Sequence, residues 1–158
     1  MTVASGIANI YGRDPMTCVQ NGRSLRSFYG DRFVMGLGVS HESIVSGAHG
    51  HAYGKPLTTM RNYLHDMERA RPHLLGEDPP VVLGALGWKM IELSGELTAG
   101  AHPFNSPPEH TRRTREILGP DKWICTAQHV IWTTDVKAAR AAARRALEFY
   151  FITPNHYR

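Results

Sequence analysis

The glycines and histidines that follow two predicted strands are the residues best placed to do chemistry. Gly36 and Gly38 end an apolar run, and Ser40 and His41 come directly after it. Glycines at the carboxyl end of a strand let the backbone approach a neighbouring group or a ligand closely. His102 ends another short run, and imidazole groups act as acids or bases near neutral pH. In a parallel sheet both histidines would lie on one rim, so the sequence predicts a ligand site there.

Two other interpretations of these residues fit less well. A dinucleotide-binding fingerprint needs a third glycine or alanine where this chain has His41, followed at once by a helix, and no helix is predicted there. A zinc site at His41, His49 and His51 is disfavoured because the three lie in a glycine-rich loop without a cysteine. We therefore interpret residues 40–54 as a loop that faces solvent or substrate.

The elements that would position these residues alternate regularly along the chain. Strands are predicted at residues 3–11, 32–39, 81–86, 99–104 and 122–133. Helices, with their caps, are predicted at residues 14–29, 55–71, 88–97, 106–118 and 135–150. Asp14 is the expected N-cap of the first helix, and Ser106 with Glu109 forms the capping box of the fourth.

Five βα units call for parallel strands joined by right-handed crossovers, which is an α/β fold. On this pattern alone an open doubly wound sheet is favoured. A (β/α)₈ barrel needs eight such units and about 250 residues.

Composition restricts the class of protein. The chain has 158 residues, 18 Lys+Arg, 14 Asp+Glu and two cysteines, which favours a single domain over residues 1–158 in a reducing compartment. Its clustered arginines alternate with glutamates in helical segments, so no nucleic-acid partner is expected. The sequence contains no apolar run of about 18 residues and no signal-peptide pattern at its start. We therefore expect a cytoplasmic protein without a membrane partner.

Several separated motifs, in one order, resemble the luciferase-like monooxygenase superfamily, and most closely its branch dependent on the deazaflavin coenzyme F420. They are the segments SGIANIY at residues 5–11, RFVMGLGVSH at 32–41, YGKPL at 53–57, VVLGALG at 81–87, GAHP at 100–103 and PEHT at 108–111. The resemblance covers nearly the whole chain. That family folds as a (β/α)₈ barrel roughly twice as long as this chain. The resemblance therefore favours a partial barrel, similar to strands three to seven, over the open sheet.

The resemblance also implies a coenzyme site at the carboxyl rim. A bulge at Ser5-Gly6, in the family often with a non-prolyl cis peptide, would support the back of the deazaflavin ring, with Ala8 following on the same strand. Val39, Ser40 and His41 would face the ring and the tail of the coenzyme, and Ala85, Leu86 and Gly87 would contact it through backbone groups. The implied chemistry is hydride transfer at C5 of the deazaflavin, with His41 as candidate acid and flavin mononucleotide as alternative cofactor.

Three departures from the family pattern leave several functions open. The family commonly has Asp-Gly where this chain has Ala99-Gly100, and no basic residue follows Phe104 closely enough to contact a coenzyme phosphate. The first-strand acid and base positions of the family have no counterpart in the chain.

The first hypothesis is an F420-dependent oxidoreductase acting on a small-molecule substrate. The second is a catalytically silent remnant, or a subunit that acts only in a homo-oligomer or with a complementing chain, because exposed strand edges invite pairing. The third is an open-sheet protein that binds another nucleotide.

Overall fold

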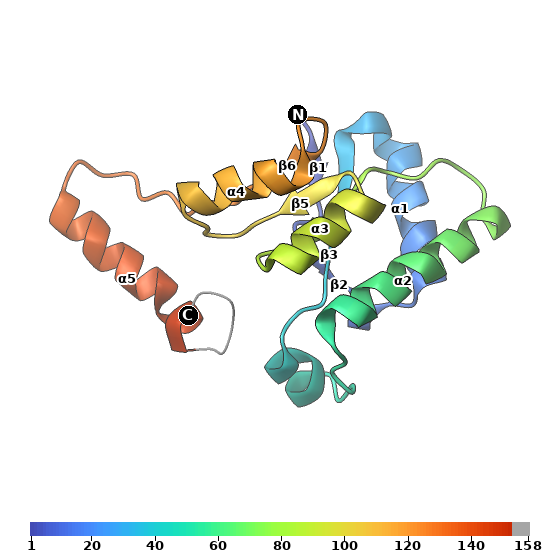
Figure 1. Cartoon of the computed structure of the whole chain (residues 1–158), viewed down its shortest axis with the longest axis horizontal. Coiled ribbons are helices and arrows are strands. Elements are labelled where there is room, and N and C mark those ends of the chain that lie inside the picture. The colour runs from blue at the N-terminus through green and yellow to red at the C-terminus, as the bar shows by residue number, and fades with distance from the viewer. Residues whose placement is uncertain (153–158) are drawn as a thin grey trace.

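The computed structural model describes residues 1–152, in which six short strands alternate with five longer helices (Figure 1). The strands are β1 (Val3–Ala4), β2 (Ala8–Asn9), β3 (Phe33–Gly38), β4 (Val81–Gly84), β5 (Gly100–His102) and β6 (Trp123–Ile124). The helices are α1 (Pro15–Tyr29), α2 (Pro56–Ala70), α3 (Trp88–Leu97), α4 (Pro108–Leu118) and α5 (Val136–Ile152). Short 3₁₀ turns occur at Ile10–Gly12, Gly30–Arg32 and Arg71–His73, and a π-helix at Ser43–Ala48. All five predicted βα units are therefore present, with β1 and β2 sharing the first predicted strand.

The strand order shows that the sheet is part of a barrel. Every strand pair is parallel, and the order β1-β3-β4-β5-β6 follows the chain without a reversal, with β2 also pairing with β3. A doubly wound sheet would reverse its strand order at a switch point. Consecutive helices also pack on each other, α1 on α2, α2 on α3 and α3 on α4. The partial barrel expected from the family resemblance is confirmed, and the open-sheet pattern is not.

A bulge separates β1 from β2. Ala4 is paired with Val34 and Ala8 with Leu37, so three residues of the first strand stand opposite two residues of β3. An extra residue in one of two paired strands defines a β-bulge, which bends that strand. The interruption occurs at residues 5–7, where the Ser5-Gly6 bulge was predicted.

Ser5 and Gly36 fix this bulge. The Ser5 hydroxyl donates to the Gly36 carbonyl at 3.1 Å and accepts from the Gly36 amide at 3.0 Å, replacing two backbone ladder bonds. Gly6 has a φ of +62°, a conformation that residues with a Cβ rarely adopt. The described residues contain no cis peptide bond, so the expected cis geometry is wrong here and the left-handed glycine turns the chain instead.

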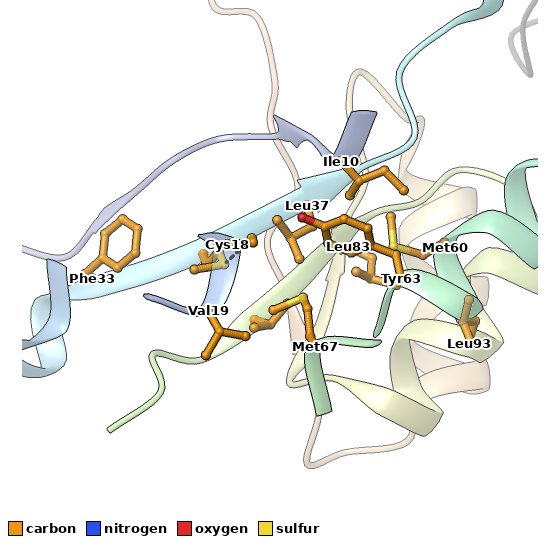
Figure 2. Close-up of a cluster of buried hydrophobic side chains, with 12 residues drawn as sticks. Ile10, Cys18, Val19, Phe33, Leu37, Met60, Tyr63, Met67, Leu83 and Leu93 are labelled. Atoms are coloured by element: carbon orange, nitrogen blue, oxygen red, sulfur yellow. Dashed lines mark hydrogen bonds between the residues drawn. The ribbon is translucent and has the colours of Figure 1, made fainter. Parts of the chain in front are cut away.

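The main hydrophobic core lies between the sheet and helices α1 to α3 (Figure 2). Leu37 of β3 and Leu83 of β4 are fully buried, as is Met60 of α2. Along the face of α2 that meets this core, Met60 and Met67 are buried while Leu57 and Leu64 are half-buried. These contacts fix α2 and α3 against β3 and β4, whose carboxyl ends carry the candidate site.

Cys18 and Tyr63 should make the fold sensitive to alkali. Burial raises the pKa of the Cys18 thiol and of the Tyr63 phenol, so both are neutral in the folded chain. Their stabilising contribution is complete below the unfolded-state pKa values, about 9 and 10, and is lost as the pH rises further, because only the unfolded chain then releases these protons. We expect the free energy of unfolding to fall by roughly 1 kcal/mol per pH unit per group above that range.

Urea unfolding at pH 8 and pH 10.5 measures this effect. The double variant Cys18→Ala, Tyr63→Phe should lose most of the pH dependence, while Tyr29→Phe, at a half-exposed position, should retain it. The prediction would be contradicted if the free energy of unfolding fell equally between pH 8 and pH 10.5 in the wild type and the double variant.

Two predicted elements differ from the structure. The strand predicted at 122–133 contains only Trp123–Ile124 and an isolated bridge from Ala127 to Phe104. Within residues 1–152, β6 pairs with β5 on one edge and with no strand on the other. The β-branched residues beyond Ala127 therefore have no second strand with which to form backbone hydrogen bonds. The segment after it is extended and leads to α5, which lies to one side of the other helices (Figure 1).

The capping box predicted at Ser106 is wrong. The N-cap of α4 is Pro107, no side chain caps this end, and the buried Ser106 hydroxyl has no hydrogen-bond partner within the described chain. The helix begins one residue later than predicted, so Ser106 precedes the N-cap and Glu109 is the second helical residue, which is not the spacing of a capping box. By contrast, Asp14 accepts a hydrogen bond from the Thr17 amide at 2.9 Å, which confirms the predicted cap of α1.

Candidate functional site

A cavity of about 410 Å³ lies at the carboxyl ends of β3, β4 and β5. Its volume falls within the range of small-molecule sites. The described residues that line it include no Asp, Glu, Lys or Arg. They are Ile7, Gly38, Val39, Ser40, His41, Tyr53, Pro56, Gly84, Ala85, Leu86, Gly87, Met90, His102, Phe104 and Tyr150. An apolar cavity with a few hydroxyl and imidazole groups suits a flat, largely uncharged ring system.

The cavity brings together six of the nine site residues predicted from the sequence. Val39, Ser40 and His41 line it after β3, and Ala85, Leu86 and Gly87 line it after β4. His102, at the end of β5, also lines it, so the two histidines lie on one rim as predicted. The other three, Ser5, Gly6 and Ala8, are not among the lining residues. They belong to the bulged strand, from which Ile7 reaches the cavity.

Ile7 occupies space that Gly38 and Gly84 leave open. A Cβ at Gly38 would overlap the Cγ2 atom of Ile7, and one at Gly84 would lie 3.0 Å from its Cδ1 atom. A Cβ at Gly36 would lie 3.5 Å from the same Cδ1 atom. Ile7 is thus the close neighbour of Gly38 and Gly84, whereas the close neighbour of Gly36 is the Gly6 carbonyl. Ile7 was not predicted as a site residue, although glycine in a strand often marks the close approach of another group.

Tyr53 holds the strand end that carries His41. Ser40 has a φ of +57°, one of two positive values at residues other than glycine in the described chain. Its carbonyl accepts a hydrogen bond from the Tyr53 hydroxyl at 3.1 Å, and the Tyr53 ring stacks on Tyr11 with centroids 5.8 Å apart. Burial raises the pKa of Tyr53, so the hydroxyl remains a donor at neutral pH. A strained residue held in this way beside a cavity is typical of binding sites.

A second hollow, of about 530 Å³, adjoins the first at Leu86. Its other lining residues are Trp88, Ser106, Pro107, Glu109, His110 and Arg113. Among these residues, Arg113 carries a guanidinium that pairs with Glu116 at 2.8 Å. The hollow therefore presents both polar and charged groups beside the apolar cavity.

The loop histidines do not form a metal centre in the described chain. The His49 and His51 rings stack at a centroid distance of 6.3 Å. Residues 1–152 contain no group of three or more His, Cys, Asp or Glu side chains that could hold a metal ion. The described helices also include none with the length and hydropathy needed to cross a bilayer.

Known proteins with similar sequences are named as an oxidoreductase and a reductase. A Mycobacterium tuberculosis protein named as a coenzyme F420-dependent oxidoreductase is 26% identical, over 94% of this chain and 55% of its own length. The 5,10-methylenetetrahydromethanopterin reductase of Methanolobus tindarius is also 26% identical, over 95% of this chain and 54% of its own length. The chain thus spans about half the length of these relatives.

Solved structures agree on the fold. The coenzyme F420-dependent tetrahydromethanopterin reductase of Methanopyrus kandleri matches with a TM-score of 0.59 and 18% identity, over 75% of this chain and 44% of that one. The apo form of MsnO8 matches with a TM-score of 0.57, also at 18% identity, over 77% of this chain and 42% of that one. The family model for luciferase-like monooxygenases matches residues 1–157. The chain therefore belongs to the luciferase-like monooxygenase family.

Proposed function

We propose that this chain carries the coenzyme-facing part of an F420-dependent oxidoreductase that acts on a small organic substrate. The observation that carries the proposal is the cavity at the carboxyl ends of β3, β4 and β5, where parallel α/β proteins bind their ligands. The coenzyme in the name of the Mycobacterium tuberculosis relative supports the choice of cofactor. When bound, coenzyme F420 supplies a site for hydride transfer at C5 of its deazaflavin ring.

The residues present fit such a ring. The apolar surface of Ile7 and the small residues Gly84 and Ala85 leave room for a flat group, and the described lining carries no fixed charge that the ring would have to desolvate. The bonds of Ser5 to Gly36 and the pairing of Ala8 with Leu37 hold the strand on both sides of Ile7. The 39–41 and 85–87 segments line the cavity, and in this proposal their backbone contacts the edges of the ring.

His41 is the proposed acid of the site. Its imidazole is exposed at the cavity rim and follows Ser40, whose carbonyl is held by Tyr53. An imidazole with access to both cavity and solvent can deliver a proton to a substrate and regain it from water. Flavin mononucleotide is the alternative occupant, since it has a ring system of the same shape.

A second candidate function is that of a subunit that works only with a complementing chain or a second copy. The observation that favours it is the open state of both sheet edges: within residues 1–152, β1 pairs only with β3 and β6 only with β5. Strand edges of this kind form hydrogen bonds with further strands when these are supplied. In this case the cavity would be complete only in the assembly.

The test is a fluorescence titration of the purified chain with coenzyme F420 and, separately, with flavin mononucleotide, followed by size-exclusion chromatography of the same samples. We expect saturable binding of coenzyme F420 by one defined species, and weaker binding of flavin mononucleotide. Tighter binding of flavin mononucleotide would replace the cofactor assignment. A folded, defined species that binds neither would overturn the proposed function, and binding that coincides with a dimer would favour the second candidate.

A further inference from the structure

We propose that His110 is a positioning residue of the coenzyme site: it fixes the 85–87 segment, which forms one wall of the cavity, from a helix outside that wall. This inference rests on the proposed function. It names a residue that the sequence motifs did not assign and that does not line the cavity itself.

The 85–87 segment needs such support because the sheet does not hold it. The ladder between β4 and β5 ends where Gly84 pairs with His102. Beyond that point the chain runs through Gly87, the N-cap of α3, and no side chain caps this helix. The backbone at Ala85 and Leu86 thus leaves the sheet at the place where it lines the cavity.

His110 bridges to this segment from α4, in the next βα unit. Its Nε2 atom lies 2.8 Å from the Leu86 carbonyl oxygen. A carbonyl can only accept, so Nε2 is the nitrogen that carries the proton in this contact. The other end of the residue is anchored as well, because the fully buried Thr114 hydroxyl donates to the His110 carbonyl at 2.8 Å and lies 3.4 Å from Nδ1.

The His110 ring also contacts the residue on the far side of Gly87. It stacks on the Trp88 indole with centroids 4.6 Å apart and an interplanar angle of 26°. Trp88 is the first residue of α3 and remains about half exposed, so this stack is its main aromatic contact in the described chain. His110 thereby holds Leu86 by a hydrogen bond and Trp88 by stacking, with the cavity-lining Gly87 between them.

This arrangement predicts that the donor at position 110, more than the bulk of the ring, sets the affinity for the coenzyme. A glutamine can place an amide N–H near the position of Nε2, whereas a phenylalanine keeps the stack on Trp88 and loses the donor. His110→Phe should weaken binding of coenzyme F420 about tenfold, the effect of losing one partly buried hydrogen bond. His110→Gln should restore affinity to within about threefold of the wild type on the same scale.

The experiment combines coenzyme titration with amide hydrogen exchange of the 85–91 segment in the protein without ligand. Exchange there should be faster in His110→Phe than in His110→Gln, and the exposed-site variant Arg112→Gln should match the wild type in both measurements. Should His110→Phe fail to fold, His110→Asn, whose shorter amide cannot reach the Leu86 carbonyl, takes its place.

Equal exchange and equal affinity in the Phe and Gln variants would overturn the positioning role. If the wild type itself binds no coenzyme, the proposed function fails. The exchange comparison still decides whether His110 holds this segment.

Discussion

Gly36→Ala should destabilise the chain by about 3 kcal/mol or prevent folding altogether, because overpacking here strikes backbone that cannot move aside. A Cβ at position 36 would overlap the carbonyl oxygen of Gly6 and lie 2.8 Å from its carbonyl carbon. Relieving the overlap would push the bulge away from β3 and break both hydrogen bonds between the Ser5 hydroxyl and the Gly36 backbone. Urea unfolding followed by circular dichroism measures the loss.

Gly47→Ala is the matched control for this substitution. Position 47 lies in the π-helix at Ser43–Ala48, and a Cβ there would have no heavy atom within 4 Å beyond its chain neighbours. The same added methyl group should change stability by no more than about 1 kcal/mol. If both variants unfold at the same urea concentration, Gly36 is not required for the close approach of β3 to the bulge.

Gly6→Val should lower the affinity for coenzyme F420 by about tenfold or more. Here the cause is backbone conformation and not space, because a Cβ at Gly6 would meet no heavy atom within 4 Å. The φ of +62° is unfavourable for a β-branched residue by about 1–2 kcal/mol. The chain can relieve this strain by straightening the bulge, which would draw Ile7 out of the space beside Gly38 and Gly84.

Asparagine separates conformation from size at this position. It is larger than glycine but tolerates the left-handed region, so Gly6→Asn should retain most of the affinity that Gly6→Val loses. Coenzyme titrations of the two variants and the wild type make the comparison, with thermal melting as the check on folding. Undiminished affinity in Gly6→Val would remove the bulge from the coenzyme site.

The helices could be predicted from the sequence because their signals are local. Asp14 before Pro15 marks the start of α1, and Trp88–Leu97 has the same bounds in sequence and structure. The strand at 122–133 was predicted too long, since β-branched residues indicate strand propensity but cannot supply a neighbour. Strand length depends on partners far away in the chain, and a single segment does not reveal them.

In the candidate site, too, the features with local sequence signals were predicted and those that depend on distant residues were not. Residues 39–41 and 85–87 follow parallel strands, and this position alone predicts that they lie together at one rim of the sheet. The roles of Tyr53 and His110 were not predicted, because each acts on a carbonyl 13 or 24 residues away. Backbone carbonyls are present at every position, so a sequence does not mark which one receives a side-chain donor. The residues that line the cavity could be predicted from their positions at strand ends. The side chains that fix those strand ends could not, because their contacts arise from tertiary packing.

The bulge between β1 and β2 also exchanges odd and even positions between the two faces of the strand. Directly paired residues of parallel strands share a face, so Val3 lies on the side of Phe33, whereas after the bulge Ala8 lies on the side of Leu37. Both β3 residues belong to the helix-facing core. Removing one residue between Ala4 and Ala8 would leave two residues opposite two residues of β3, so Ala8 and Asn9 would keep their partners and their faces while the bulge itself was lost. A second extra residue would instead turn Ala8 and Asn9 to the opposite face. The single extra residue thus serves a local purpose, because it lets Ser5 bond to the Gly36 backbone through its side chain before the strand returns to the register of β3.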